Sequence, residues 1–152
     1  MSTRQIAATL AAAVLLTAVL PPLFASAVNR RRIQLAADDA SRLAERFGPV
    51  LTEAHVASGV EVLCGSGRVP AAATDEAQRW IAGVRASPLP VLGHDAPMDP
   101  WGRCYLVNAA NMATAGGAVW VLSAGPNGVI DTRFVTRAGQ PLAGDDIGAL
   151  VR

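Results

Sequence analysis

The sequence predicts an α+β protein in which one long N-terminal helix packs on a small antiparallel β-sheet. Three observations predict this class: an uncharged run from Ile6 to Val28, helical spacing of apolar residues directly after it, and short strand-like segments separated by turn residues in the remainder. The 152 residues suffice for one modest domain and an anchor. We expect residues 1–28 to be a transmembrane anchor and residues 29–152 to be the folded domain.

The uncharged run has three interpretations: a transmembrane anchor, a cleaved signal peptide, or a buried core helix, which a domain this small could hardly surround. As a helix it would span about 34 Å at roughly 1.5 Å per residue, enough to cross a bilayer core. Alternatively, Ala25-Ser26-Ala27 has the pattern of a signal-peptidase site, and cleavage after Ala27 would release a soluble periplasmic binding or accessory module. The positive-inside rule places Arg30, Arg31 and Arg32 on the cytoplasmic side, which opposes an exported body, so charge alone does not choose.

The residues after Pro21 and Pro22 favour the anchor. Apolar residues recur there at alternating spacings of three and four, which predicts one face of a helix: Ile33, Ala36, Ala40, Leu43, Phe47 and Val50. The opposite side is charged, and Asp38 stands four residues before Arg42, an acid-before-base spacing that supports a helix. An apolar segment therefore continues into an amphipathic helix, as expected of an anchored stalk.

The body is predicted from short segments. We expect a helix from Asp75 to about Val84, capped by Thr74, with Trp80 and Ile81 facing inward. Strands are expected at residues 59–64, 105–107 and 118–122, and Val129, Ile130 and Phe134 are expected to extend a further strand. Residues 65–73 are expected to be a loop, and Asp99 is expected to bind local amides in the turn that Pro100 and Gly102 favour.

Composition and motifs argue against several functions. The net charge of +1 provides no long-range field for nucleic acid. His55 and His94 stand in none of the common hydrolase or metalloprotease motifs, so we expect no enzyme activity. Cys64 and Cys104 form no C-x-x-C pair; they are either a disulfide or two buried thiols, and spacing does not decide between these.

Three segments resemble the major pseudopilin family of type II secretion. Asp99-Pro100-Trp101-Gly102-Arg103-Cys104-Tyr105 is similar to the family's D-P-W-G-x-P-Y signature, with Cys104 in place of proline. The segment Leu122-Ser123-Ala124-Gly125-Pro126-Asn127-Gly128 resembles its S-x-G-x-D-G loop, with Asn127 in place of aspartate, and Asp145-Asp146-Ile147-Gly148 resembles its closing D-D-I-G element. The match covers most of the chain, although Gln5 stands where the family has an assembly glutamate.

The resemblance implies a pilin-like fold and a mechanical role. The chain would be a single-pass inner-membrane protein with a periplasmic C-terminal domain, and it would assemble into a pseudopilus-like filament that acts in protein secretion across the outer membrane. Its expected partners are copies of itself or other pseudopilins, the inner membrane and the secretion assembly platform. Gln5 would take the position that contacts a neighbouring subunit's N-terminus.

The resemblance also implies a calcium ion in the C-terminal loop. Asn127, Asp131, Asp145 and Asp146 offer the amide and carboxylate oxygens that calcium prefers. The spacing is not that of an EF-hand. The alternative is that Asn127 is a turn residue and Asp131 a solvated loop charge.

Overall fold

The computed structural model describes residues 24–46, 62–82, 84, 96–108 and 119–151. The chain divides into two compact units, residues 1–32 and residues 33–152. The boundary expected after residue 28 was based on where the uncharged run ends, whereas the boundary after residue 32 reflects how the chain packs. Most of the expected anchor, together with Gln5, His55 and His94, lies outside the described residues.

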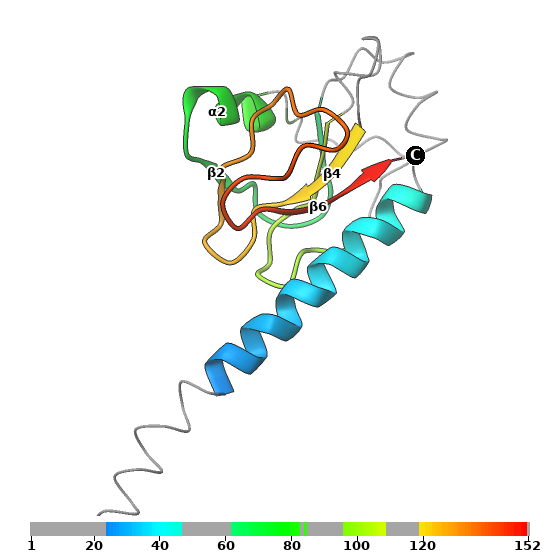
Figure 1. Ribbon diagram of the computed structural model, residues 1–152, viewed down its shortest axis with the longest axis vertical. Coiled ribbons are helices and arrows are strands. Elements are labelled where there is room, and N and C mark those ends of the chain that lie inside the picture. The colour runs from blue at the N-terminus through cyan, green and yellow to red at the C-terminus, as the bar shows by residue number, and fades with distance from the viewer. Residues whose placement is uncertain (1–23, 47–61, 83, 85–95, 109–118, 152) are drawn as a thin grey trace, which may run out of the picture. The chain divides into compact units, whose positions relative to one another are not determined.

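The N-terminal helix comprises residues 24–46 (Figure 1). Of the helices that the structure describes, none is both long enough and apolar enough to span a bilayer. Within the second unit, the helix buries Ala36, Ala40, Leu43 and Ala44, which confirms the predicted apolar face from Ala36 to residue 46. Ile33, expected on the same face, is 37% exposed, so the prediction is wrong there. Phe47 and Val50, expected on the same face, are outside the described ranges.

The charged side of the helix corrects one detail of the prediction. Arg42 was paired by spacing with Asp38, but its Nη2 lies 2.6 Å from Asp39 Oδ1 instead. Arg42 Nε donates to the carbonyl oxygen of Asp38 at 3.4 Å. The i,i+3 partner is reached because the guanidinium bends back over the preceding turn, and the exposed pair adds little stability.

A four-stranded antiparallel sheet forms the centre of the second unit. It consists of β1 (Val62–Cys64), β3 (Leu106–Asn108), β4 (Val119–Ser123) and β6 (Ile147–Val151), in the order β1-β3-β4-β6. Two short strands, β2 (Ala71–Ala72) and β5 (Val129–Ile130), pair in parallel beside it, and α2 (Asp75–Ala82) follows β2. This arrangement confirms the predicted α+β class with a small antiparallel sheet.

Several local predictions are confirmed, two are wrong, and one strand was not predicted. Thr74 caps α2, since its Oγ1 accepts the amide of Ala77 at 3.1 Å, and Trp80 is fully buried. The expected loop at residues 65–73 contains β2, Phe134 does not extend β5, and β6 was not predicted as a strand at all. Strand β6 escaped notice because Gly148 and the small Ala149 give it a weak β-propensity; pairing with β4 compensates for this.

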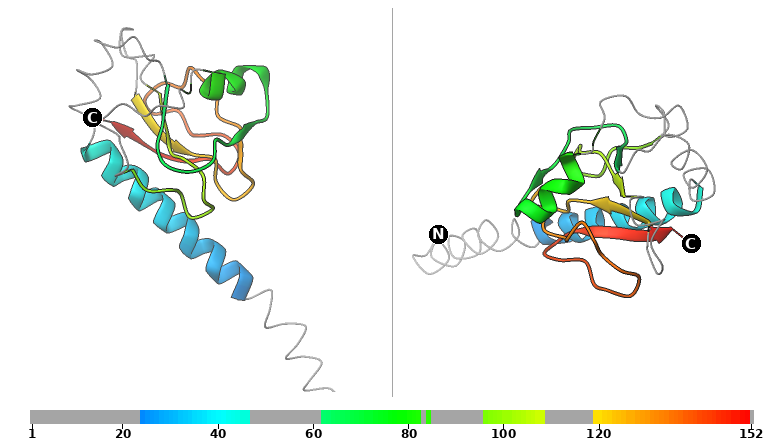
Figure 2. Two further views of the ribbon diagram at one scale, coloured as in Figure 1. Left: turned by 180° about the vertical axis from the view of Figure 1, so that it is seen from behind. Right: turned by 90° about the horizontal axis from the view of Figure 1, so that it is seen from above.

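The sheet separates two apolar clusters, one on each face. On one face, Ala40, Leu43 and Ala44 of the helix pack against Tyr105, Val107, Val119 and Val121. On the other face, Leu106, Trp120 and Leu122 pack against Trp80, Ile130 and Phe134. The alternation along β3 and β4 follows from the two-residue period of a strand. Figure 2 shows the helix segment of residues 40–46 along the β4 and β6 side.

Tyr105 joins the helix to the sheet. Its hydroxyl donates to the carbonyl oxygen of Ala36 at 3.4 Å, and the ring is 1% exposed. Burial, with smaller effects from the charges of Asp39 and Asp99, raises the pKa of the Tyr105 hydroxyl well above its usual range. The hydroxyl is therefore a neutral donor at any physiological pH.

Candidate functional site

The candidate site is a cluster of loops before β6 and around β5. The turn Gly125–Gly128 connects β4 to β5, Asp131 follows β5, and Gly144, Asp145 and Asp146 lead into β6. Gly144 has a positive φ of 60°, and a Cβ there would overlap the carboxylate of Asp131. Glycine is required at this position because both the backbone conformation and the close approach exclude a side chain.

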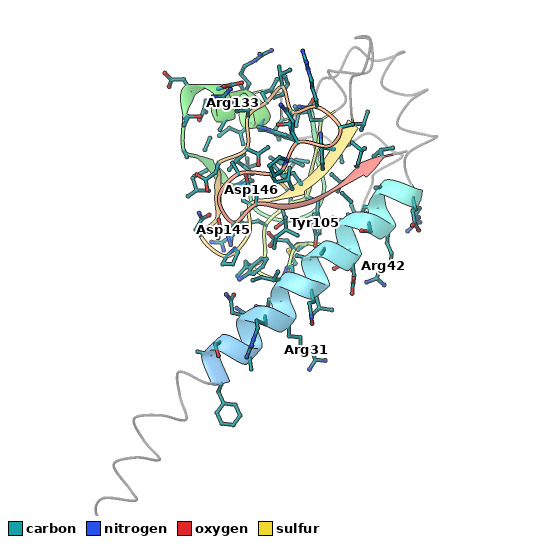
Figure 3. The ribbon with its side chains drawn as sticks, in the orientation of Figure 1. Arg31, Arg42, Tyr105, Arg133, Asp145 and Asp146 are labelled. Carbon is teal, nitrogen blue, oxygen red and sulfur yellow. A yellow bond between two sulfur atoms is a disulfide. The ribbon has the colours of Figure 1, made fainter. Side chains whose placement is uncertain are left out.

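All four residues predicted as metal ligands meet in this cluster, and Figure 3 labels two of them, Asp145 and Asp146. The backbone amide of Asn127 donates to Asp145 Oδ2 at 2.9 Å, and the side-chain Nδ2 of Asn127 donates to Asp131 Oδ2 at 3.4 Å. The Asp131 amide donates to Asp146 Oδ2, also at 2.9 Å. Hydrogen bonds therefore connect all four residues, although Asn127 and Asp146 are far apart in the sequence.

Asp146 accepts two backbone hydrogen bonds through one carboxylate oxygen. Its Oδ2 accepts the amides of Asp131 and Thr132, at 2.9 and 2.7 Å. Burial raises the pKa of the Asp146 carboxyl above its ordinary value; the amide hydrogen bonds act in the opposite direction, and the charge of Asp131 adds to the increase. A cation next to Asp146 would stabilise the ionised carboxylate and lower its pKa.

Two carboxylate oxygens in the cluster have no hydrogen-bond partner among the described residues. Asp145 Oδ1 and Asp146 Oδ1 are both buried and both unpartnered. Within the described part of the chain, no arginine forms an ion pair with Asp131, Asp145 or Asp146. Buried carboxylate oxygens are normally satisfied by a donor or by a cation.

The donor chemistry fits a hard cation, with a limit. No three His, Cys, Asp or Glu side chains among the described residues converge as a ready-made metal site. A cation here would be held by Asp145 and Asp146, with backbone carbonyl oxygens and water completing its shell. Asn127 Oδ1 already accepts the backbone amide of Val129 at 2.7 Å, as expected if Asn127 is a turn residue. Such mixed oxygen ligation at flexible geometry suits calcium.

Side chains of α2 and of the sheet hold the segment between β5 and β6. Trp80 Nε1 donates to the carbonyl oxygen of Thr132, Asn108 Nδ2 to that of Phe134, and Trp120 Nε1 to that of Thr136, at 3.0, 2.9 and 3.0 Å. Alternate carbonyls are thus occupied by side-chain donors where a strand would offer its backbone. This pattern explains why Phe134 lies in an ordered segment without belonging to β5.

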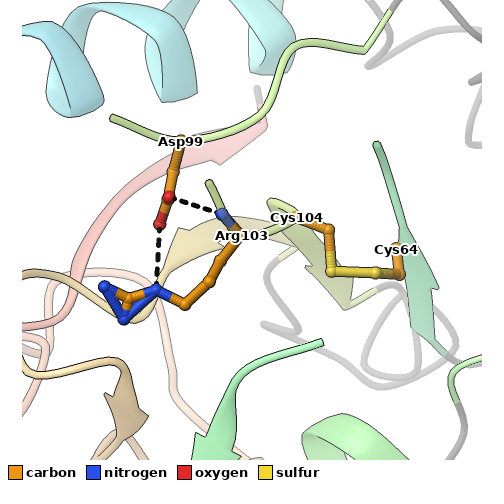
Figure 4. The surroundings of a disulfide bond; sticks show 4 residues. All are labelled: Cys64, Asp99, Arg103 and Cys104. Carbon is orange, nitrogen blue, oxygen red and sulfur yellow. Dashed lines mark hydrogen bonds and ion pairs between the residues drawn. A yellow bond between two sulfur atoms is a disulfide. The ribbon is translucent and has the colours of Figure 1, made fainter. Parts of the chain in front are cut away.

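A second carboxylate centre supports the turn at residues 125–128. Asp99 is 3% exposed, and its Oδ1 accepts the amides of Trp101 and Arg103, at 2.9 and 2.8 Å. Its Oδ2 accepts the hydroxyl of Ser123 at 2.8 Å and lies 3.9 Å from Arg103 Nε (Figure 4). The prediction that Asp99 binds local amides is confirmed.

Arg103 is the site residue that sequence reasoning missed. Its Nη2 donates to the carbonyl oxygen of Gly125 at 3.0 Å, which links the Asp99 turn to the turn that carries Asn127. The contact spans 22 residues, so no local spacing predicts it. One signal was present: from residue 100 to residue 130, Arg103 is the sole charged residue.

Cys64 and Cys104 form a disulfide next to this centre, with their Cα atoms 5.6 Å apart (Figure 4). The bond joins the edge strand β1 to the residue directly after Arg103 and closes a sequence separation of 40 residues. The structure thus answers the question that the sequence left open. Cys104, which replaces proline in the resembled signature, fixes the end of the turn by a covalent bond.

Comparison with known proteins gives no further guide. No protein-family model, no curated protein and no solved structure matches the chain.

Proposed function

We propose that the chain is a structural subunit of a type II secretion pseudopilus-like filament. The observation that carries the proposal is that the two ends of the N-terminal helix differ in burial. From Ala36 onward one face is buried on the sheet, whereas the described residues before it, 24–35, are exposed. A helix that uses one end to hold a folded head leaves its other end for a membrane and for neighbouring subunits.

The exposed part of the helix is apolar enough for such contacts. Phe24 and Val28, in the first unit, are 66% and 52% exposed, and Leu35, in the second, is 42% exposed. They follow an uncharged run in which Ala7, Ala8, Ala11, Ala12 and Ala13 are small enough for helices to approach closely in lipid. These features support copies of this chain, or other pseudopilins, as partners.

The disulfide supports a body on the oxidising side of the membrane. Disulfides persist in the periplasm and are rare in the cytosol. The pair Cys64–Cys104 therefore favours an inner-membrane protein with a periplasmic C-terminal domain. It is also an argument against the opposite orientation that the arginines after Val28 suggest.

The alternative is a soluble periplasmic module released after Ala27. The described structure favours the anchored form, because Ala25, Ser26 and Ala27 lie in the helix of residues 24–46 and cleavage requires local opening of such a segment. No enzymatic role is proposed, because the sequence has none of the common hydrolase or metalloprotease motifs.

We further propose that calcium stiffens the head. Asp145 and Asp146 would hold the ion through the two oxygens that lack a partner, with Asn127 and Asp131 on its border. The bound ion would neutralise adjacent carboxylates and tie the turn at residues 125–128 to the start of β6. The role is structural, since a filament subunit needs a rigid head.

Intact-mass measurement on the protein extracted from native membranes tests the anchored form. We expect a chain that retains residues 1–27 and resists extraction by alkaline carbonate. A mass that lacks those residues, in a freely soluble protein, would replace the proposed function by the released module. Assembly is tested separately by cross-linking within the membrane, where we expect a ladder of multimers.

A further inference from the structure

The described start of the N-terminal helix carries three consecutive arginines, Arg30, Arg31 and Arg32, and all three are exposed. No Asp or Glu occurs anywhere before Asp38, so the sequence offers them no local counter-charge. None of the ion pairs in the described residues involves them. Figure 3 shows the labelled Arg31 extending away from the helix.

The arginines directly follow exposed apolar residues on the same unit of the chain. Phe24 and Val28 are largely exposed, and Asn29 separates Val28 from Arg30. Along a helix axis Val28 and Arg30 differ by roughly 3 Å. This is the sequence of environments met on passing from the hydrocarbon region of a bilayer into its headgroups.

We infer that Arg30, Arg31 and Arg32 form a collar that binds the phosphates of anionic phospholipid headgroups at the membrane surface. The inference rests on the proposed membrane anchor, and it adds a lipid class as a partner. The guanidinium group suits this ligand, because its planar fork donates two parallel hydrogen bonds to a phosphate.

Helix geometry favours lipid over a second copy of the chain. Successive residues on a helix turn by about 100°, so three consecutive arginines spread over about 200° of its circumference within roughly 3 Å of its length. A neighbouring helix contacts one stripe and would leave part of this set unpaired. A headgroup layer surrounds an inserted helix at one level and meets all three.

Native mass spectrometry of the detergent-solubilised full chain, with phosphatidylglycerol and phosphatidylcholine in equal amounts, tests the collar. Polybasic segments at a membrane surface gain about fivefold in affinity for anionic lipid per arginine. We expect the wild type to retain at least about tenfold more phosphatidylglycerol than phosphatidylcholine. The triple variant Arg30→Gln/Arg31→Gln/Arg32→Gln should bring this ratio close to one, and raising the salt to about 0.5 M should weaken the wild-type preference.

Two controls sharpen the test. The variant Arg68→Gln/Arg133→Gln/Arg137→Gln removes the same charge from exposed positions of the head and should keep the preference. The variant Arg30→Lys/Arg31→Lys/Arg32→Lys should keep much of it, with a loss that reflects the guanidinium fork. Glutamine is a good helix former, so the melting temperature of the head should stay unchanged in the variant Arg30→Gln/Arg31→Gln/Arg32→Gln.

The same spectra distinguish the failures. One outcome would be that the variant Arg30→Gln/Arg31→Gln/Arg32→Gln loses multimers while its lipid ratio stays that of the wild type. In that case the three arginines bind a second copy of the chain, and the proposed lipid collar is wrong. An equal ratio for both lipids in the wild type also overturns it, whatever the state of assembly. Failure of the proposed function appears elsewhere, as a mature chain without residues 1–27, and does not depend on the lipid ratio.

Discussion

Two carboxylate centres lie on either side of the turn at residues 125–128, and they differ in how their oxygens are satisfied. At Asp99 both oxygens have partners: two amides on one, and the Ser123 hydroxyl with the nearby Arg103 on the other. At Asp145 and Asp146 one oxygen of each carboxylate is bonded and the other is buried without a partner. The protein itself satisfies both oxygens of Asp99, although Arg103 Nε beside it is buried without a hydrogen-bond partner among the described residues. The second centre leaves carboxylate oxygens unpartnered and has capacity for a cation.

The comparison teaches that buried acidic residues in one loop system can serve different ends. Asp99 gains its stability from the protein itself, so removing it should damage the fold under all conditions. The Asp145–Asp146 pair has neighbouring negative charges and no arginine among its described contacts. Its contribution to stability should therefore depend on calcium and on pH.

The largest effect is expected from Asp99→Ala. The substitution leaves the amides of Trp101 and Arg103 and the hydroxyl of Ser123 without their acceptor, and it leaves the largely buried Arg103 without its nearest carboxylate. Removing one partner of such a buried network costs about 3–5 kcal/mol. Denaturant unfolding measures the loss, and Asp38→Ala, at an exposed helix position, is the control. A loss below about 1 kcal/mol would show that the two centres do not differ in the way described.

Removal of the disulfide should come next. The double variant Cys64→Ser/Cys104→Ser frees a segment with a sequence separation of 40 residues, which the chain-entropy model values at about 4 kcal/mol. The same unfolding measurement should show this loss with and without calcium, because the bond acts beside the Asp99 centre. A calcium-dependent loss would instead mean that the disulfide supports the Asp145–Asp146 pair.

Calcium should stabilise the wild type and not the variant Asp145→Asn/Asp146→Asn. At a calcium concentration about 100 times the dissociation constant, the expected gain in unfolding free energy is about 2.7 kcal/mol. Thermal melting in calcium and in EDTA measures it, and Asp75→Asn, in the first turn of α2, is the control for a change of surface charge. An identical melting temperature in calcium and EDTA would contradict the proposed cation site.

The smallest effect concerns pH in EDTA. The pKa of Asp146 is raised in the folded protein, so the folded state binds a proton more readily than the unfolded state does. Stability from this group is therefore lost as pH rises from the unfolded pKa of Asp through the raised folded value, and regained on acidification through that window. Asp146→Asn should remove this pH dependence and give slightly higher stability than the wild type at neutral pH in EDTA, but lower stability in calcium. Melting curves across this pH range would contradict the prediction if the variant and the wild type ran parallel.

Much of the fold was predictable because it depends on local periodicity. The spacing of Ala36, Ala40 and Leu43 predicts the buried face of the helix, and the β-forming residues of β3 and β4 predict the central strands. Strand β6 was not predictable in this way, since Gly148 and Ala149 have a weak preference for a strand and interrupt its β-forming residues. Pairing with β4 over five residues, from Val119↔Val151 to Ser123↔Ile147, decides its conformation.

The candidate site divides in the same manner. The residue types and the family resemblance indicated Asn127, Asp131, Asp145 and Asp146, because oxygen donors and turn-forming glycines are visible in a sequence. The unpartnered oxygens are not visible there, because they result from hydrogen bonds that use one oxygen of each carboxylate and leave the other. The role of Arg103 was hidden for the same reason, as its acceptor stands far along the chain.

By itself, the sequence determined the α+β class, the amphipathic helix, the cap at Thr74 and the turn at Asp99, because each depends on neighbours within a few positions. The tertiary structure alone decided that Cys64 meets Cys104, that Arg103 holds Gly125, and that two aspartates turn one oxygen each into a buried space. These contacts join segments that are distant in the chain. Their geometry is set by the packing of the whole sheet, which no local pattern encodes.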